Sequence, residues 1–227
     1  YKNKKKSSII KKQENETAAL DFLEKKFDGL KTNNIKILYD MGGIYKSFEK
    51  YDEAIKIYSK LLDLLDNRSK AYADILYRRG GSFERIGDYE TADKDLLESL
   101  KITRENPYVL NYLAYSWLER NYKIELSMEM LKEAYDLRKN DPYITDSLGW
   151  GYYLINDFEN AEKYLKKAVE LMPYDPIVND HYGDILWMLN RKIQARYFWN
   201  NVLNLEETDD EMKINVKKKI IYGIEKT

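Results

Sequence analysis

The side chains best suited to chemistry lie in the last third of the chain, around its single histidine. His181 lies between Asp180 and Asp184, and because residues three apart share one face of a helix, its imidazole and a carboxylate could bind zinc or iron there. Asp146 and Ser147 suggest hydrolase chemistry if they lie beside His181. One histidine and acids without a motif are more typical of an ordinary polar surface, so both hypotheses remain secondary.

Motifs for catalysis or cofactor binding are absent from the sequence. The chain has no HExxH, GxxxxGKS/T or GxGxxG pattern, and a regular helix offers a serine nucleophile neither the sharp turn nor the oxyanion hole that it needs. The lack of cysteine excludes disulfides, cysteine-ligated zinc, iron–sulfur clusters and thiol catalysis. We therefore expect no enzyme activity, no metal and no cofactor.

The charge balance favours protein partners over nucleic acid. Lys and Arg number 38 and Asp and Glu number 39, for a formal charge of −1, so no overall positive field recruits nucleic acid or anionic membrane. Aromatic residues make up 14% of the chain, with only 4 Pro and 10 Gly. This composition is too poor in turn formers for a β-sandwich or β-barrel.

A repeat of about 34 residues must position these side chains, because a fixed period in this range indicates a solenoid. One equivalent position holds Gly42, Gly80, Ala114, Gly149 and Gly183, and a second holds Ala54, Ala92, Ser127, Ala161 and Ala195. Glycine inside a helix is unfavourable relative to alanine, so we expect close packing of two helices where these small residues meet. A short turn, with Glu49, Gly87, Asn121, Asn156 or Asn190 in left-handed conformation, should join the two helices.

These residues resemble the tetratricopeptide repeat. The small residues stand at its eighth and twentieth positions, an aromatic side chain stands at the eleventh (Tyr45, Phe83, Trp117, Tyr152), and Pro173 lies near a repeat end. The resemblance implies an all-α solenoid, a right-handed superhelix of helix-turn-helix pairs. The five repeats would span residues 35–68, 73–106, 107–141, 142–175 and 176–209.

Both flanks of the repeats also suggest helices. Residues 1–34 combine a basic segment with NETAALDFLEKKFDGL, which resembles the second helix of a partial repeat. Residues 210–227 should form a capping helix, with Thr208 and Glu211 as a possible capping box and Met212, Val216, Ile220 and Ile224 as its apolar stripe. The lysines of residues 1–12 are interpreted as a solvated linker.

The resemblance also implies where a ligand would bind, because the first helix of each pair lines the concave face. The candidate groove consists of Tyr108, Asn111, Tyr112, Tyr115, Asp146, Trp150, Tyr153, Asp180, His181, Asp184 and Trp187. Tyr and Trp provide large contact area and a polar tip, and Asn111, Asp146 and Asp180 could accept hydrogen bonds from peptide amides. The alternative is that these aromatic side chains serve ordinary packing between repeats.

The implied function is a scaffold or adaptor that binds peptide segments of partner proteins, and the alternative is self-assembly into a homo-oligomer. NYLAYSW (111–117), DSLGWGYYL (146–154) and NDHYGDILW (179–187) resemble segments of exported bacterial repeat proteins, including outer-membrane lipoprotein adaptors for carboxyl-terminal processing proteases. That resemblance, over about 107–205, implies a periplasmic or envelope-associated protein with a lipid anchor upstream. A cytoplasmic location is the alternative, and no span crosses the membrane.

Overall fold

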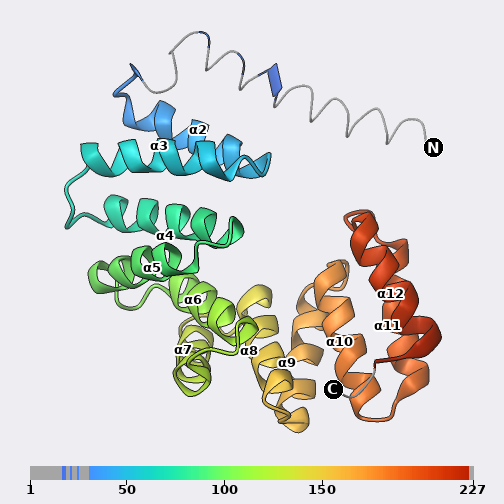
Figure 1. The fold of residues 1–227 in the computed structure, drawn as a ribbon. Coiled ribbons are helices and arrows are strands. Elements are labelled where there is room, and N and C mark those ends of the chain that lie inside the picture. Colours follow the sequence, from blue (N-terminus) through green and yellow to red (C-terminus); the bar gives the residue numbers. More distant parts are fainter. Residues whose placement is uncertain (1–16, 19–20, 22–24, 26–30, 225–227) are drawn as a thin grey trace. The chain divides into compact units, whose positions relative to one another are not determined.

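A computed structural model describes residues 31–224, together with positions 17–18, 21 and 25 (Figure 1). The described part contains helices and no strand, which confirms the all-α expectation. The chain divides into two compact units, one ending at Arg104 and the other beginning at Glu105. The expected helix within residues 14–30 and the lysines of residues 1–12 lie largely or wholly outside the described residues.

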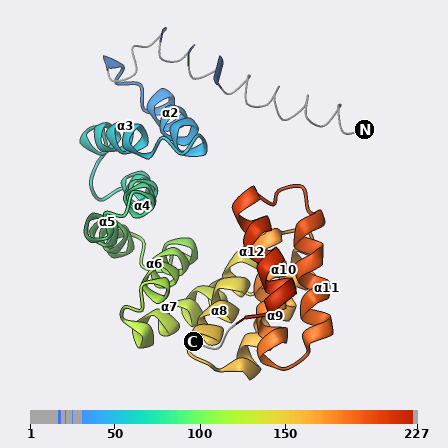
Figure 2. The ribbon, with the colours of Figure 1, turned by 45° about the vertical axis from the view of Figure 1, so that its right-hand side comes forward.

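From residue 31 onward, unit 1 contains two helix pairs, and unit 2 contains three pairs and a final helix (Figures 1 and 2). The helices of unit 1 in this range are α2 (Ile35–Ser47), α3 (Tyr51–Leu64), α4 (Lys70–Arg85) and α5 (Tyr89–Ile102). Those of unit 2 are α6 (Pro107–Glu119), α7 (Ile124–Leu137), α8 (Pro142–Leu154), α9 (Phe158–Leu171), α10 (Pro176–Met188), α11 (Lys192–Asn204) and α12 (Asp210–Tyr222).

The turn within each pair has the expected left-handed residue. The residues with positive φ at the expected positions are Glu49 (59°), Gly87 (81°), Asn121 (53°), Asn156 (62°) and Asn190 (61°), and the turn between α6 and α7 has a second one, Lys123 (46°). This conformation ends a helix and lets the chain reverse direction, and asparagine and glycine tolerate it best. Sequence alone therefore located the reversal in all five pairs.

Short polar residues and proline start the first helices of unit 2. Asn106, Asp141 and Asp175 each accept a hydrogen bond from a backbone N–H of the following turn. A proline follows each of them at the first helical position, where its missing N–H costs nothing and its fixed φ suits a helix. The start of α6, α8 and α10 is thus set by the same local signal.

The glycines at the eighth position allow close packing. A Cβ at Gly80 would lie 3.2 Å from the carbonyl oxygen of Ala92, the expected neighbour, whereas at Gly183 and Gly149 the nearest atoms belong to larger side chains. A Cβ at Gly183 would collide with the indole ring of Trp199, and a Cβ at Gly149 would collide with Leu165. Each of these neighbours lies four residues after the alanine that was expected to be closest. The alanines are buried, and the large side chain one turn later fills the space that the glycine leaves.

Each unit has its own apolar core. In unit 1, buried Leu38 and Met41 of α2 pack with Tyr58 and Leu61 of α3. A buried charge pair adds to this packing, because Arg79 donates from Nε and Nη2 to the two carboxylate oxygens of Asp95, at 2.7 and 2.8 Å. Two-point pairing compensates for part of the cost of burying both charges.

Helix α12 covers the end of unit 2. Val216 is buried, and Met212, Ile220 and Ile224 pack against the same core cluster, which confirms the predicted stripe. The predicted capping box is wrong. Asp209 is the N-cap and accepts from the backbone N–H of Met212 at 2.7 Å, whereas the hydroxyl of Thr208 donates to the carbonyl of Val202 at 2.6 Å.

Candidate functional site

The candidate groove residues lie on the first helices of unit 2, where α8 contacts both α6 and α10. We call this surface the α6–α8–α10 face. Its residues differ in exposure. Asp146, His181 and Asp184 are buried, Tyr108 is exposed, and the other seven are partly buried. The face is therefore a mixture of internal packing and accessible surface.

Trp150 joins the three helices. Its indole N–H donates to Glu119 Oε1 of α6 at 2.7 Å. Its ring stacks on Tyr153, with centroids 4.5 Å apart, and on His181 of α10, with centroids 4.0 Å apart. Because its side chain contacts both α6 and α10, Trp150 preorganises the face, and removing it would also disturb the packing between helices.

His181 and Asp146 form a buried pair between α10 and α8. Nδ1 of His181 lies 2.9 Å from Oδ2 of Asp146. Burial alone would lower the pKa of His181, but the charge and hydrogen bond of Asp146, helped by Asp184 and Asp180, outweigh it and raise that pKa. The pair fixes the imidazole plane beneath Trp150, so its observed role is to position that ring.

Both carboxylate oxygens of Asp184 are hydrogen-bonded within the protein, so this side chain is not available to a ligand. Its Oδ1 accepts from the indole N–H of Trp199 at 2.9 Å, and Lys219 of α12 donates to both carboxylate oxygens at 2.8 and 2.7 Å. Burial and the neighbouring charge of Asp180 still raise the pKa of Asp184 to about 6. Two carboxylates, Asp180 and Asp184, thus share the single ammonium of Lys219.

Lys219 is the partner that sequence analysis missed. It is not a member of the predicted apolar stripe, and the sequence assigned it no partner. It donates to Asp180 at 2.8 Å as well as to Asp184. Lys219 lies three residues after Val216 of the apolar stripe, and this helical spacing was a signal that its side chain turns toward α10.

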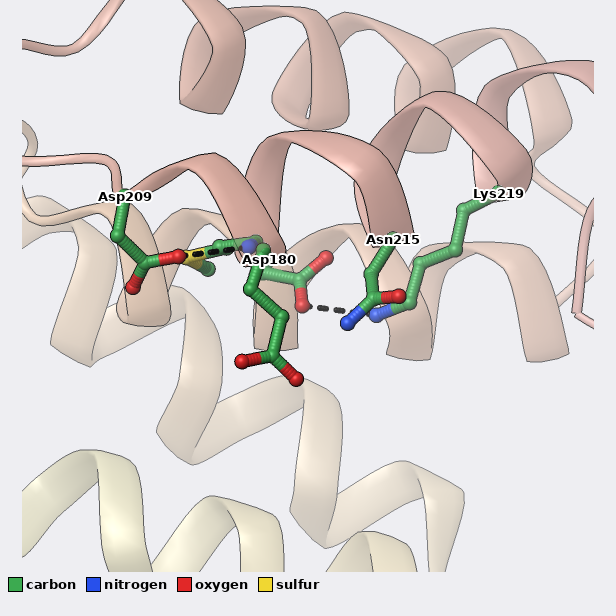
Figure 3. Close-up of a pocket in the computed structure, with 6 residues that line it drawn as sticks. Asp180, Asp209, Asn215 and Lys219 are labelled. Atoms are coloured by element: carbon green, nitrogen blue, oxygen red, sulfur yellow. Dashed lines mark hydrogen bonds and ion pairs between the residues drawn. The ribbon is translucent and has the colours of Figure 1, made fainter.

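An open pocket of about 490 Å³ lies between α10 and α12 (Figure 3). Its lining comprises Asp180, Asp209, Glu211, Met212, Asn215 and Lys219. Three carboxylates and one ammonium thus line the pocket, and the ammonium is already bonded to Asp180 and Asp184. The fields of Asp175, Glu207 and Asp141, after the larger effect of burial, raise the pKa of Tyr143 at the start of α8, so negative charge extends beyond the pocket.

Two equivalent positions of α6, α8 and α10 offer contacts to a partner. At the second position, Tyr108, Tyr143 and Ile177 are 45%, 59% and 53% exposed. At the fifth position, one side-chain oxygen of Asn111, of Asp146 and of Asp180 is buried and has no hydrogen-bond partner within the described residues. The face therefore combines exposed apolar surface with acceptors that lack donors.

Trp187 contacts the end of the chain more than the rest of the face. Its indole N–H donates to the carbonyl of Ile224 at 3.3 Å, and its ring lies 5.4 Å from that of Trp199. A Cβ at Gly223 would collide with the same ring. Trp187 therefore helps to dock the segment that follows α12.

Metal binding finds no support in the described part of the chain. No group of three or more histidine, aspartate and glutamate side chains there has the arrangement of a metal site. The hydrolase alternative has no geometric support either, since the observed partner of His181 is Asp146 and no serine bonds to it within the described residues. No described helix has the length and apolar character needed to cross a bilayer.

Comparison with known families identifies the repeats. The model described as tetratricopeptide repeat matches residues 35–64, 73–106 and 147–175. A TPR repeat-containing protein of Pseudomonas aeruginosa is 29% identical over 120 residues, which cover 53% of this chain and 18% of that relative. The chain thus spans less than a fifth of this relative's length.

Solved structures share the fold at low sequence identity. A thermophilic TPR protein of Thermus thermophilus superposes with a TM-score of 0.70 at 16% identity, covering 82% of this chain and 99% of that one. A tetratricopeptide repeat protein of Parabacteroides merdae gives 0.69 at 16%, covering 95% and 83%. The pilF protein of Pseudomonas aeruginosa gives 0.66 at 19%, covering 83% and 85%. The chain therefore shares the solenoid fold of these proteins, and three of its segments match the tetratricopeptide repeat.

Proposed function

We propose that this chain, which carries tetratricopeptide repeats, binds an extended segment of a partner protein on its α6–α8–α10 face. Proteins with these repeats generally act as non-catalytic scaffolds for protein interaction. The observation that carries the more specific proposal is the pair of equivalent positions on three successive helices, one exposed and apolar and the other with unpartnered oxygens.

The oxygens of Asn111, Asp146 and Asp180 select for donors. A buried acceptor without a partner costs about 1–3 kcal/mol, and a ligand that supplies an N–H group recovers part of this cost. Small side-chain rotations would bring such oxygens to the surface, and the backbone amides of an extended segment recur along its length. Tyr108, Tyr143 and Ile177 would then contact the side chains of that segment.

The pocket between α10 and α12 favours a basic residue at one end of the bound segment. Asp180, Asp209 and Glu211 line it, and Lys219 is committed to Asp180 and Asp184. A lysine or arginine of the partner would add the positive charge that this corner lacks. The bound segment is thus expected to be extended and basic.

Substitutions of exposed residues can test this proposal without disturbing the apolar core. A set of labelled 12-residue peptides with net charges of +3, 0 and −3 would be titrated into the full chain by fluorescence anisotropy. We expect the +3 peptides to bind best, and Tyr143→Ala with Ile177→Ala to weaken them at least tenfold. Tyr197→Ala on α11, of similar exposure to Tyr143, is the matched control. Equal affinity for all variants would refute the proposed face.

A charge test addresses the pocket separately. Asp209→Asn keeps an N-cap acceptor while removing charge, and Glu211→Gln removes a second charge. We expect the two together to weaken the +3 peptides and reduce the salt dependence of binding. Asp210→Asn is the control, because Asp210 is adjacent and its side chain is almost fully exposed. If all three substitutions weaken binding equally, the effect comes from the overall charge of the protein and not from the pocket.

We also propose a finer role, an adaptor for a protease or an assembly complex in the bacterial envelope. Its support is the similarity of residues 107–205 to exported bacterial repeat proteins. Lipid labelling and fractionation of the full-length protein in its native cell test this role. Recovery in the soluble cytoplasmic fraction would contradict it.

Self-association is a second candidate function, supported by exposed apolar side chains on α11 and α12. Ile193 and Tyr197 of α11 and Ile214 and Ile221 of α12 are all more than half exposed. Size-exclusion chromatography with light scattering distinguishes the two functions. A monomer that retains peptide binding contradicts the assembly role.

A further inference from the structure

Unit 1 presents a second surface, which the proposed function does not use. On α2, Tyr39, Gly43 and Lys46 follow one another at helical spacing and share one side of the helix. On α4, Arg78 and Arg85 are seven residues apart and also share a side. Arg78 joins the two helices, because its guanidinium carbon lies 4.6 Å from the centre of the Tyr39 ring.

The cations of this surface are not fully compensated. Asp74 accepts from Nε of Arg78 at 2.9 Å. Lys46 is half-buried and makes no ion pair with any residue that the structure describes. Burial first, and then the positive charges of Arg78 and Arg85, lower the pKa of Lys46, while the opposing effect of Glu84 is smaller. Clustered like charges of this kind are typical of sites that bind an opposite charge.

Gly43 leaves room for a ligand at this point. A Cβ added there would meet no atom within 4 Å. The equivalent ninth position of α8 holds Trp150, whose ring stacks on Tyr153 and His181. The helix surface between Tyr39 and Lys46 is therefore open, and a partner can approach the backbone of α2 there.

We propose that this α2–α4 surface, formed by Tyr39, Gly43, Lys46, Arg78 and Arg85, binds an acidic segment of a partner protein. The spacing argues for a segment and against a single phosphate ion. Arg78 and Arg85 are seven residues apart, or about 10 Å along α4 at 1.5 Å per residue. In an extended chain of the polyproline II type, with three residues per turn and a rise of about 3.1 Å, two carboxylates three residues apart lie on one side and span about 9 Å.

The test uses the full chain and a labelled 12-residue peptide with two glutamates three residues apart. Controls are the same peptide with both glutamates replaced by glutamine, the peptide with one glutamate, and inorganic phosphate as competitor. We expect the two-glutamate peptide to bind at least tenfold tighter than the glutamine peptide, with weaker binding at higher salt. Competition by phosphate at the peptide's own concentration would overturn the proposal in favour of a free anion.

Variants assign the binding to this surface. Lys46→Gln with Arg85→Gln should weaken the acidic peptide at least tenfold, whereas Lys56→Gln on α3, an exposed lysine of the same repeat, should change it less than twofold. Lys46→Met distinguishes a binding role of Lys46 from a role in stabilising the fold, because the two roles predict opposite changes in melting temperature. Removing a half-buried, uncompensated cation should raise the melting temperature by about 2 °C while binding weakens.

These outcomes are independent of those for the α6–α8–α10 face. Unchanged affinity of the acidic peptide in the double variant would overturn the α2–α4 surface, whether or not +3 peptides bind to unit 2. A drop in melting temperature for Lys46→Met would also count against it, because it would show that Lys46 stabilises the fold.

Discussion

Units 1 and 2 use the same helix pair but differ in net charge. Residues 35–104, which form the repeats of unit 1, contain 13 Lys and Arg and 13 Asp and Glu, whereas residues 105–227 contain 16 Lys and Arg against 21 Asp and Glu. The ninth position of the first helix is open at Gly43 in unit 1 and filled by Trp150 in unit 2. The repeat thus specifies the backbone, while the variable positions decide the charge and shape of each surface.

The charged residues of the two units also differ in how far they are compensated. In unit 2, Asp184 and Asp180 are bonded to Lys219, and Asp146 is bonded to His181. In unit 1, Lys46 has no ion pair among the described residues and is crowded by Arg78 and Arg85. Internal pairing is therefore more complete on the α6–α8–α10 face than on the α2–α4 surface, where Arg78 pairs with Asp74 and Lys46 has no ion pair among the described residues.

The largest expected effect comes from breaking the helix contact in unit 2 while sparing unit 1. Gly183→Ala introduces a Cβ that collides with Trp199, which is fully buried and bonded to Asp184. We expect the free energy of unfolding to fall by about 3 kcal/mol. Gly43→Ala should instead raise it by up to about 1 kcal/mol, because its Cβ meets open space and alanine favours helix.

Urea denaturation followed by circular dichroism measures both glycine variants. If both variants lost a similar free energy of unfolding, the two glycines would have the same backbone role. The predicted difference in packing between the units would then be wrong.

A smaller effect is expected from the pH dependence of unit 2. The pKa of Asp184 is raised from 3.8, its ordinary value, to about 6 in the folded protein. Protonation of Asp184 therefore contributes its full stabilisation below pH 3.8, and this contribution is lost as the pH rises from 3.8 through about 6. Asp184→Asn keeps an acceptor for Trp199 and removes the titration. We expect wild type to lose on the order of 2 kcal/mol between pH 4 and 7, and the variant to lose less.

Thermal melts at several pH values measure this difference between Asp184→Asn and wild type. The pKa of His181 is also raised, so its titration also lowers the stability of the folded state as the pH rises, but at higher pH. The melting-temperature profiles of wild type and Asp184→Asn should therefore have the same slope above pH 7. Parallel profiles over the whole range would contradict the assignment to Asp184.

The smallest effect concerns the left-handed turns. Glu49 in unit 1 has φ of 59° and Asn156 in unit 2 has φ of 62°. Glutamate tolerates this conformation less well than asparagine, so Glu49→Gly should stabilise the protein by about 0.5 kcal/mol and Asn156→Gly by less. Melting temperatures compare the two, and a larger gain for Asn156→Gly would reverse the expected order.

Local signals were sufficient for most of the fold. The left-handed residues, the small residues at the eighth position and the Asn-Pro or Asp-Pro helix starts each act within a few residues, so spacing alone predicted the helix pairs. The family resemblance then indicated which helices carry the candidate face. These features depend on backbone geometry, which a repeat conserves from one copy to the next.

The features that could not be predicted from the sequence depend on side chains that are distant along the chain. Lys219 and Asp184 are 35 residues apart and meet only because α12 packs against the last pair. The cap at Asp209 was misassigned by one residue, because Thr208 is also a good capping residue and its hydroxyl instead bonds to Val202. Which predicted groove residues face a ligand and which are already paired could not be inferred from periodicity.

The distribution of tryptophan has a practical consequence for separating the two units. All four tryptophans, Trp117, Trp150, Trp187 and Trp199, belong to unit 2, so indole fluorescence excited at its red edge observes that unit alone. Circular dichroism observes helices from both. A denaturation curve recorded with both signals on the unlabelled protein will therefore show whether the units unfold together or one after the other.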